Sequence, residues 1–333
     1  MKSRTLVKDG AGIHPVGIGA MSFSNFYGPT TEAQSIAILD AAMDAGVNHI
    51  DTANVYGIGT SETVIGTYLK SNPEAKDHFT IATKGAISRA PDGSGNIIDN
   101  SAQHLEAALD SSLKRLGLEA VDLYYVHRLD ARIPIEEVAQ TLGRFVKAGK
   151  AKAIGFSEIA PTSLRRAHAV HPVAAVQSEY SLSTRSPEMG LVQTCAELGT
   201  ALVAFSPVGR SFLTDTPLSH EAVQDLPFLV NNPRFMQPNY DANIAAVAPF
   251  QALAVDMGLS TAGLAIAWVL AQGEHIIPIP GTRSVNHLRQ LLQGANRPLT
   301  DDELREIERV LPIGWAHGDR YSVAQWAGPE RYC

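Results

Sequence analysis

The sequence predicts a (β/α)8 barrel, the TIM-barrel fold, from three observations. Eight short apolar runs recur along the chain, each long enough for one strand. A stretch of helical pattern follows each run, and the connections are short. Strands that alternate with helices pair in parallel through right-handed crossovers, and eight such units close into a barrel of about 250 residues plus insertions. We therefore interpret residues 1–333 as a single barrel domain with long loops at its C-terminal rim.

An open, doubly wound sheet is the alternative fold. Such a sheet binds dinucleotides at a Gly-x-Gly-x-x-Gly turn that follows its first strand. The corresponding segment here is residues 17–22, and Ser22 stands where the third glycine belongs. The sequence therefore favours the barrel.

Composition narrows the class of partner. The formal net charge is -7, and charges of both signs are scattered along the chain, so no basic face for nucleic acid or anionic lipid is indicated. No apolar run approaches the roughly 20 residues that cross a bilayer, and no secretory signal follows the first residues. The two cysteines, Cys195 and Cys333, cannot form a disulfide framework. We expect a cytoplasmic protein, either a monomer or a homo-oligomer, that acts on a small molecule.

The chain begins with an expected β-hairpin over residues 1–15. Apolar residues flank Asp9-Gly10, and Asp-Gly in such a setting indicates a tight hairpin. We expect this hairpin to cover the floor of the barrel. The first barrel strand, residues 16–19, is rich in glycine, and small residues at its end allow a ligand to approach the backbone.

Apolar runs predict the other strands, and helical patterns predict the helices between them. The strands are expected at residues 47–50, 79–83, 121–126, 151–155, 173–176, 201–205 and 275–279. The helices are expected to include residues 36–43, 62–69, 105–116, 134–149, 164–169, 187–198, 243–257, 261–271, 284–293 and 301–311.

Local signals place several helix ends. Thr30 or Thr31 can cap the first helix, and Ser61 can cap the second. The helix at residues 105–116 shows the clearest apolar side, and a glycine ends it. Pro134 opens the next helix, because proline in a first turn costs a helix nothing.

Three long segments fall outside this pattern. Residues 88–100 are polar and contain proline and glycine, so we expect a loop. Residues 211–240 form an insertion whose four prolines argue against one continuous helix. Residues 312–333 form a C-terminal tail that carries aromatic residues.

Polar residues with catalytic potential follow three of the predicted strands. Asp51 and Tyr56 follow the second strand, Lys84 follows the third and His127 follows the fourth. The carboxyl ends of all barrel strands face one rim, where barrel active sites lie. Taken singly, Tyr56 could be a packing residue, and Asp51 and Lys84 could each belong to an ordinary salt bridge. Their shared placement favours a catalytic site.

Further motifs end the remaining strands. They are Gly155-Phe156-Ser157, Gln177, Phe205-Ser206-Pro207 and Ile279-Pro280-Gly281-Thr282-Arg283. Together with Asp51-x-Ala53-x-x-Tyr56-Gly57, Lys84 and His127, these motifs resemble those of the aldo-keto reductase family over nearly the whole chain. The resemblance implies a barrel that binds a nicotinamide cofactor across its C-terminal rim and reduces an aldehyde or ketone.

The resemblance implies that Asp51, Tyr56, Lys84 and His127 are catalytic, and their chemistry suits carbonyl reduction. The alkoxide needs a proton, and a phenol with a reference pKa near 10 donates poorly at neutral pH unless a cation lowers that pKa. Lys84 can supply the cation, with Asp51 as its counter-charge. His127 can donate a hydrogen bond to the substrate oxygen. Tyr56 is the predicted proton donor.

The resemblance also implies a set of cofactor contacts. Ser157 and Gln177 match positions that hold the nicotinamide carboxamide, and Phe205 matches an aromatic residue that stacks on the ring. Ser206, Val208 and Gly209 match the loop around the pyrophosphate. The other expected cofactor contacts are Gly19, Ala20, Met21 and Asp51.

The adenine end is expected at the start of a late helix, where amide groups and a cation favour phosphate. The residues expected there are Gly281, Thr282, Arg283, Ser284, His287 and Gln290. Arg283 with Ser284 favours the 2′-phosphate and hence NADPH. NADH stays possible, because His287, Gln290 and Leu291 differ from the residues common in relatives.

Aromatic residues indicate an apolar or ring-containing carbonyl substrate. The expected pocket wall comprises the insertion together with Phe23, Asn25, Phe26, Tyr27, Arg128, Trp315, Tyr321, Trp326 and Tyr332. The alternatives are physiological oxidation of an alcohol or sugar with NAD(P)+, a cofactor-binding regulatory subunit resembling channel-associated relatives, and a barrel hydrolase. No metal site is predicted, because a metal hydrolase would need clustered ligands such as His-x-His at a strand end.

Overall fold

The computed structural model describes residues 2–7, 10–90 and 95–331. Within them, eight strands form one parallel sheet in the order β1-β2-β3-β6-β7-β8-β9-β10. They are β1 (Ile18–Gly19), β2 (His49–Asp51), β3 (Thr80–Gly85), β6 (Leu123–Val126), β7 (Ile154–Ser157), β8 (Val173–Glu179), β9 (Ala201–Phe205) and β10 (Ile276–Pro278). Residues in or next to β1 and β10 close the sheet, because Gly17 N donates to Pro278 O at 2.9 Å and Gly19 N donates to Pro280 O at 3.0 Å. The predicted (β/α)8 barrel is confirmed.

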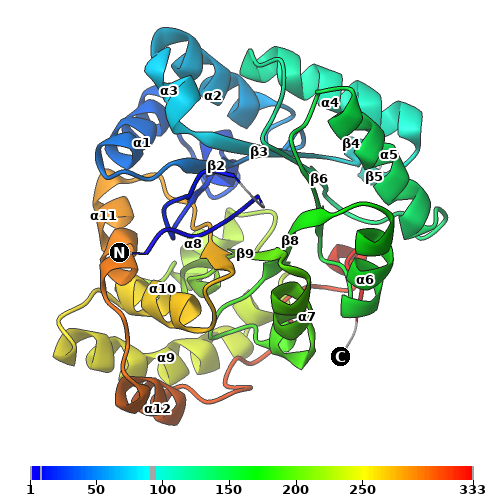
Figure 1. The fold of residues 1–333 in the computed structure, drawn as a ribbon. Helices are drawn as coiled ribbons and strands as arrows, with labels where there is room; N and C mark the ends of the chain where they lie inside the picture. The colour runs from blue at the N-terminus through cyan, green and yellow to red at the C-terminus, as the bar shows by residue number, and fades with distance from the viewer. Residues whose placement is uncertain (1, 8–9, 91–94, 332–333) are drawn as a thin grey trace.

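An outer layer of helices surrounds the strands (Figure 1). The α-helices are α1 (Glu32–Asp44), α2 (Thr60–Ser71), α3 (Glu74–His78), α4 (Ala102–Leu116), α5 (Ile135–Lys147), α6 (Pro161–Val170), α7 (Leu191–Leu198), α8 (His220–Gln224), α9 (Asn239–Asp256), α10 (Thr261–Ala271), α11 (Val285–Gln293) and α12 (Asp301–Val310). The expected helices are present except that the one predicted over residues 187–198 is divided at Gly190, which has φ of 127°, into the 3-10 helix η2 (Ser186–Met189) and α7. The short helices α3 and α8 were not expected.

Side-chain caps begin several helices. Thr31 forms a capping box with Gln34 at the start of α1, as one of the two expected threonines. Gly117 ends α4 in a left-handed conformation, with φ of 67°. The expected cap at Ser61 is wrong, because α2 begins one residue earlier, at Thr60. The buried Ser61 hydroxyl instead donates to Ala20 O at 2.8 Å, which ties α2 to the segment after β1.

The N-terminal segment lies across one end of the barrel (Figure 1). Arg4 and Ile13 exchange backbone hydrogen bonds of 2.8 and 2.9 Å in an antiparallel bridge. The turn residues Lys8 and Asp9 lie outside the described part of the chain. Leu6 and Ile13 belong to the same buried apolar cluster as Leu123 of β6. The two apolar residues therefore pack against the inner faces of the strands, where a floor would lie.

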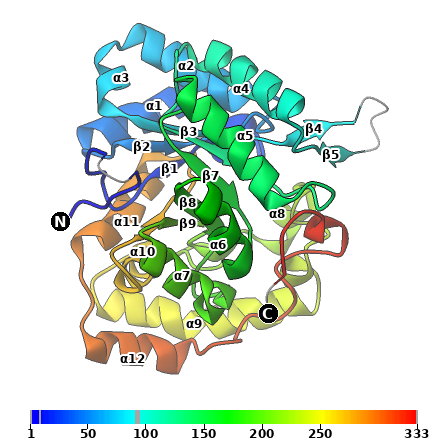
Figure 2. The same ribbon diagram turned by 45° about the vertical axis from the view of Figure 1, so that its right-hand side comes forward.

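The expectation of a loop over residues 88–100 is wrong on both sides of residues 91–94, which lie outside the described residues. Two short strands, β4 (Ile87–Arg89) and β5 (Asn96–Ile98), pair antiparallel. The isoleucines in β4 and β5 have the β-branched shape that favours strands. Figure 2 shows this hairpin projecting from the barrel.

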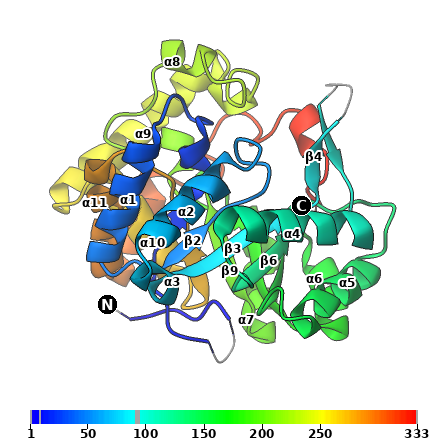
Figure 3. The same ribbon diagram turned by 90° about the horizontal axis from the view of Figure 1, so that it is seen from above.

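The insertion and the tail lie on the same side of the molecule and are joined. As predicted, the insertion is not one helix, and it contains α8 and the 3-10 helix η4 (Pro233–Phe235). Asn232 Nδ2 donates to Arg320 O at 2.6 Å, and Gln325 Nε2 donates to Phe228 O at 2.9 Å. The tail also passes beside the β4–β5 hairpin (Figure 3), where a Cβ on Gly328 would lie 2.7 Å from Ile98 Cδ1.

In the described residues, no single helix is both long and apolar enough to cross a membrane. Helices α9 and α10 pass this test of length and composition only as a pair, and they are bent by 89° at the break between them.

Candidate active site

The structure brings Asp51, Tyr56, Lys84 and His127 together at the C-terminal rim. The Lys84 ammonium forms an ion pair with Asp51 Oδ1 and donates to Thr52 O at 2.8 Å. It also lies 3.4 Å from the Tyr56 hydroxyl oxygen. The Tyr56 and His127 rings meet edge to face, with centroids 5.7 Å apart. Four side chains from three strand ends thus form one cluster, as the sequence predicted.

Neighbouring strands and one turn place these groups. Asp51 is the last residue of β2, and Lys84 lies near the end of β3, the next strand in the sheet. His127 follows β6, and its amide N donates to Gly85 O at 3.0 Å. Tyr56 lies on the loop after β2, where its amide N donates to Ala53 O at 3.2 Å. The phenol is therefore held on a turn, and the other three groups are held on the barrel wall.

Lys84 is fully buried, with Asp51 as its counter-charge. Burial by itself lowers the pKa of Lys84, but the Asp51 carboxylate and the Tyr56 phenol outweigh that effect and raise the pKa above its ordinary value. The side chain is therefore a charged ammonium at neutral pH. Thr52 O fixes its direction together with Asp51, although no sequence signal singled out Thr52.

The pKa of Tyr56 departs from the expectation of a lowered value. Burial raises the pKa of the phenol, and the nearby Lys84 ammonium offsets this only in part. The sequence identified the cation but not the burial that opposes it. Tyr56 therefore keeps its proton at neutral pH, and Lys84 makes the loss of that proton less costly.

His127 is neutral in this environment. Burial lowers its pKa well below the ordinary value, and the charges of Arg128 and Lys84 lower the pKa further. Among the described residues, the buried Nδ1 atom has no hydrogen-bond partner. A neutral imidazole has one N–H donor and one acceptor, so His127 can donate a hydrogen bond without bringing a charge.

Ser157 and Gln177 lie side by side next to this cluster. They are partners in the register between β7 and β8. Gln177 Nε2 donates to Asp51 Oδ2 at 2.8 Å, and Ser157 Oγ accepts from Arg128 Nη1 at 3.0 Å. These neutral polar groups fit the carboxamide of a nicotinamide ring, which both donates and accepts hydrogen bonds. Phe205 ends β9 and is half-buried.

The residues expected at the phosphates follow β9 and β10, and the expected cofactor contacts Gly19, Ala20 and Met21 lie at the end of β1. Gly209 N donates to Ser206 O at 2.9 Å, which makes a tight turn around Val208. Gly19 and Gly281 lie so close that a Cβ on Gly281 would be 2.9 Å from Gly19 O. Ala20 and Met21 continue from this contact in the 3-10 helix η1 (Ala20–Ser24), and Ser22 Oγ donates to Thr282 O at 2.9 Å.

The start of α11 carries the remaining expected contacts. Ser284 is its N-cap and accepts from His287 N at 3.5 Å. Arg283 is half-buried, and its Nη1 donates to Pro29 O at 3.0 Å. Gln290 Nε2 donates to Asp215 Oδ2 at 2.9 Å, so this amide is partly engaged by the insertion. A helix N-terminus beside a guanidinium fits an anionic group such as a phosphate.

A model of the aldo/keto reductase family matches residues 15–312. The chain belongs to the aldo/keto reductase family. The predicted family is therefore confirmed, and with it the oxidoreductase class.

Individual relatives of this aldo/keto reductase cover most of its length. It is 36% identical over 309 residues to "Aldo-keto reductase yakc [NADP(+)]" of Schizosaccharomyces pombe, which covers 92% of this chain and 91% of that protein. It is 40% identical over 312 residues to "Probable aldo-keto reductase 1" of Glycine max, covering 93% and 88%. A solved structure of a glycerol dehydrogenase from Gluconobacter oxydans superposes with a TM-score of 0.82 at 26% identity, covering 93% and 96%.

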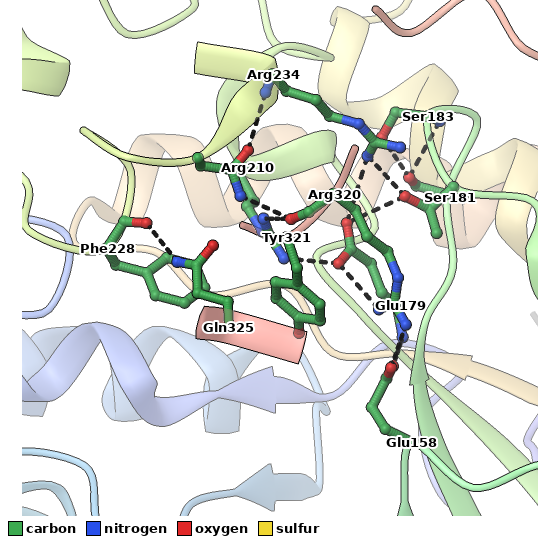
Figure 4. A network of polar contacts seen from close by, with 12 residues as sticks. Glu158, Glu179, Ser181, Ser183, Arg210, Phe228, Arg234, Arg320, Tyr321 and Gln325 are labelled. Carbon is green, nitrogen blue, oxygen red and sulfur yellow. Dashed lines mark hydrogen bonds and ion pairs between the residues drawn. The ribbon is translucent and has the colours of Figure 1, made fainter. Parts of the chain in front are cut away.

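A buried charge cluster near the rim of this aldo/keto reductase was not predicted from the sequence. Figure 4 shows it, and we call it the cap cluster: Glu158, Glu179, Arg210, Arg234 and Arg320. Glu179 Oε2 lies 2.6 Å from Arg210 Nη2 and 3.4 Å from Arg320 Nη1. Arg234 Nη1 lies 3.6 Å from Glu179 Oε1, and Arg320 pairs with Glu158. The cluster joins the ends of β7 and β8 to the insertion and the tail.

The expected pocket wall is assembled in part around this cluster. The Arg210 guanidinium lies between the Phe228 and Tyr321 rings, 5.0 Å from each centroid. Phe26 packs on Phe228, with centroids 4.9 Å apart. Phe23 belongs instead to the buried core, and Tyr332 lies outside the described residues. Among the described residues, no group of three or more His, Cys, Asp or Glu could hold a metal ion.

Proposed function

We propose that this chain reduces an aldehyde or ketone to the alcohol with NADPH and that Tyr56 donates the proton. The observation that carries the proposal is the convergence of Tyr56, Lys84, Asp51 and His127 beside Ser157 and Gln177. A bound reduced nicotinamide supplies a hydride to the carbonyl carbon. Every other part of the reaction falls to side chains of the rim.

Tyr56 moves the proton. Its raised pKa keeps the phenol protonated at neutral pH, so the proton is available when negative charge develops on the carbonyl oxygen. Lys84, 3.4 Å from the phenol oxygen, stabilises the phenolate that forms. Asp51 and Thr52 O hold the ammonium in place and keep it charged. The proton leaves Tyr56 Oη and forms the alcohol O–H bond.

His127 orients the carbonyl. A neutral imidazole N–H donates to the carbonyl oxygen and shares its developing negative charge. An imidazolium would compete with Tyr56 as proton donor, and burial prevents that form at neutral pH. His127 is therefore a positioning and polarising group in this proposal, with Tyr56 as the acid.

NADPH is the proposed cofactor. Ser157 and Gln177 would hold the carboxamide, Phe205 would stack on the nicotinamide ring, and Ser206, Val208 and Gly209 would border the pyrophosphate. Arg283 at the start of α11 binds the 2′-phosphate, in line with the NADP(+) in the name of the Schizosaccharomyces pombe relative. Equal catalytic efficiency with NADH, or a preference for it, would contradict this assignment.

Tyr56→Phe tests the proposal directly. We expect kcat to fall at least about 100-fold, because a positioned acid contributes about 10² to 10⁴ in rate. The Kd for NADPH, measured by fluorescence titration, should stay within about twofold, because a π-face and most apolar area are retained.

The matched control is Tyr68→Phe, which removes a hydroxyl that donates to Asp40 at 2.9 Å between α1 and α2. This variant should keep kcat near that of the wild type. Turnover by Tyr56→Phe at a substantial fraction of the wild-type rate would remove Tyr56 from the role of donor.

Oxidation of an alcohol is the second candidate function. It is favoured by the likeness to a solved structure whose title names a glycerol dehydrogenase. The same groups would act in reverse, with Tyr56 as phenolate accepting the alcohol proton. Initial rates for alcohol and carbonyl compounds, measured across pH with each cofactor, distinguish the two directions, because oxidation needs the deprotonated phenol and rises with pH.

A further inference from the structure

Arg128 is a half-buried cation at the rim. Its Nη1 donates to His127 O at 2.7 Å and to Ser157 Oγ at 3.0 Å, and its Nη2 lies 3.5 Å from the Tyr321 hydroxyl. These three partners are neutral. In the described part of the chain, no carboxylate forms an ion pair with Arg128, whereas Arg132 on the same loop pairs with Asp130 at 2.6 Å.

This cation lies close to the reacting groups. It follows His127 directly, and its charge lowers the pKa of both His127 and Tyr56. The bond to Ser157 places it beside the expected nicotinamide contacts, and the bond to Tyr321 places it against the pocket wall. The Arg128 guanidinium therefore lies between an expected nicotinamide contact, Ser157, and a residue of the expected pocket wall, Tyr321.

The cofactor does not account for the charge of Arg128. The residues expected at its phosphates follow β9 and β10, whereas Arg128 follows β6, which β7 and β8 separate from β9 in the sheet. The cofactor group expected beside Arg128 is the carboxamide, which is neutral. A bound dinucleotide would leave the guanidinium without a negative partner.

The cap cluster does not supply a negative partner either. It contains three arginines and two glutamates, and both glutamates already pair with arginines. The Nε atom of Arg210 is buried without a hydrogen-bond partner among the described residues. The cap cluster itself thus has one more positive than negative charge and offers no free carboxylate to Arg128.

Taking the proposed reductase function as given, we infer that the natural substrate carries a carboxylate near its carbonyl group and that Arg128 binds this carboxylate. A guanidinium offers two parallel N–H donors that match the two carboxylate oxygens. An ionic hydrogen bond in a partly desolvated site discriminates strongly against an uncharged analogue. The substrate class is thus an aldehyde acid or keto acid, and the aromatic wall of Phe228 and Tyr321 suits one that contains a ring.

Matched substrates test this inference. The test uses the three isomers of carboxybenzaldehyde and their methyl esters. The isomers place the carboxylate at three different distances from the aldehyde, and each ester removes the negative charge. With NADPH, the wild type should reduce the best acid with a kcat/KM at least about 10-fold above that of its ester, the discrimination expected of a charged hydrogen bond. In Arg128→Met this ratio should fall to about one, mainly through a higher KM for the acid.

Two variants refine the test. Arg128→Lys keeps the charge without the two-pronged geometry and should give an intermediate ratio. Arg132→Met removes a cation that is already paired and should keep the wild-type ratio. Because Arg128 also contacts Ser157, the acid-to-ester ratio is the decisive readout, since a defect in cofactor placement lowers both rates together.

Two outcomes would overturn the inference. If the wild type reduces the esters as well as the acids, the carboxylate site is refuted, while the proposed function stands. An equal loss for acid and ester in Arg128→Met also refutes the site. If none of these aldehydes is reduced, the proposed reductase function fails for aromatic aldehydes. Calorimetry with the alcohol 4-(hydroxymethyl)benzoate then tests the carboxylate site without any turnover. If Arg128→Met raises the Kd for this alcohol about 10-fold, the result supports the carboxylate site, and an unchanged Kd refutes it.

Discussion

The Lys84–Asp51 pair and the cap cluster are both buried ion-pair sites, but they differ in composition and origin. The pair has one cation and one anion at neighbouring strand ends, beside the neutral phenol of Tyr56. The cap cluster has three cations and two anions drawn from the ends of β7 and β8, the insertion and the tail. The first site directs its charge at a group that can lose a proton. The second joins separate segments.

Burial of a charged group alone therefore does not show whether it acts in catalysis or in stability. Breaking either site leaves a charge in a poorly solvated place, so both changes should destabilise the fold. Only the change at Lys84 should also remove a group that acts on Tyr56. The two sites can therefore be separated by measuring stability and turnover on the same variants.

The largest effect is expected for Lys84→Met. We expect kcat to fall about 1000-fold, since acid catalysis by Tyr56 would lose its supporting cation. The free energy of unfolding should fall by about 3–5 kcal/mol, because Asp51 stays buried without its partner. Steady-state kinetics and urea denaturation measure the two losses.

The double variant Lys84→Met/Asp51→Asn separates these losses. It removes the unpaired charge, so most of the stability should return while kcat stays low. If stability and kcat both returned, the kinetic defect would have come from misfolding. Lys84 would then have a structural role like that of the cap cluster.

Arg320→Met is expected to have the next largest effect, mainly on stability. Loss of its pairing with Glu158 and Glu179 should lower the free energy of unfolding by about 3 kcal/mol. The control is Arg305→Met, in an exposed pair with Asp302, where the change should be within about 1 kcal/mol. Equal denaturation midpoints for the two variants would show that the cap cluster does not hold the tail.

Arg283→Ala changes a cation that, unlike Lys84 and Arg320, forms no buried ion pair among the described residues. We expect the KM for NADPH to rise about 10-fold, equivalent to about 1.4 kcal/mol, and the KM for NADH to stay nearly constant. Kinetics with both cofactors provide the measurement. Parallel increases for both would place Arg283 away from the 2′-phosphate.

The smallest expected effect is on pH dependence and concerns Glu179. Burial raises the pKa of this carboxyl, but Arg210, Arg320 and Arg234 outweigh burial and hold the pKa below its ordinary value. A depressed folded-state pKa contributes stability above the unfolded pKa, near 4.3, and that stability is lost as the pH falls toward the folded pKa.

Urea denaturation between pH 3 and pH 6 tests this effect. Below about pH 4.3, the stability of the wild type should fall more steeply than that of Glu179→Gln, by at most about 1.4 kcal/mol per pH unit for one proton. Above about pH 5 the two curves should run parallel. Parallel curves throughout would mean that the pKa of Glu179 is not depressed.

The sequence predicted the barrel and the rim cluster because their signals are local. Each strand is a short apolar run, and Asp51, Lys84 and His127 lie at or just after strand ends that parallel pairing brings to one edge. The cap cluster had no such signal, since Glu179 and Arg320 are 141 residues apart and neither lies in a distinctive motif. The direction in which the pKa of Tyr56 is shifted was also not predicted, because it depends on the burial of the phenol.

Two errors came from signals with more than one meaning. The proline and glycine signals of residues 88–100 indicated a loop, but residues on both sides of 91–94 pair as β4 and β5. Ser61 precedes an apolar helical pattern, as an N-cap residue does. Its short hydroxyl side chain donates instead to Ala20 O in the buried interior. Tertiary contacts decided both cases.

The closure between β1 and β10 has a consequence for biosynthesis. Residues 17–19 receive their final partners only when residues 278–280 have left the ribosome. At the usual elongation rate of about 5–20 residues per second, one side of the first strand has no partner for on the order of tens of seconds. An open strand edge invites pairing with other chains. The nascent polypeptide is therefore most vulnerable to aggregation until its final strand emerges.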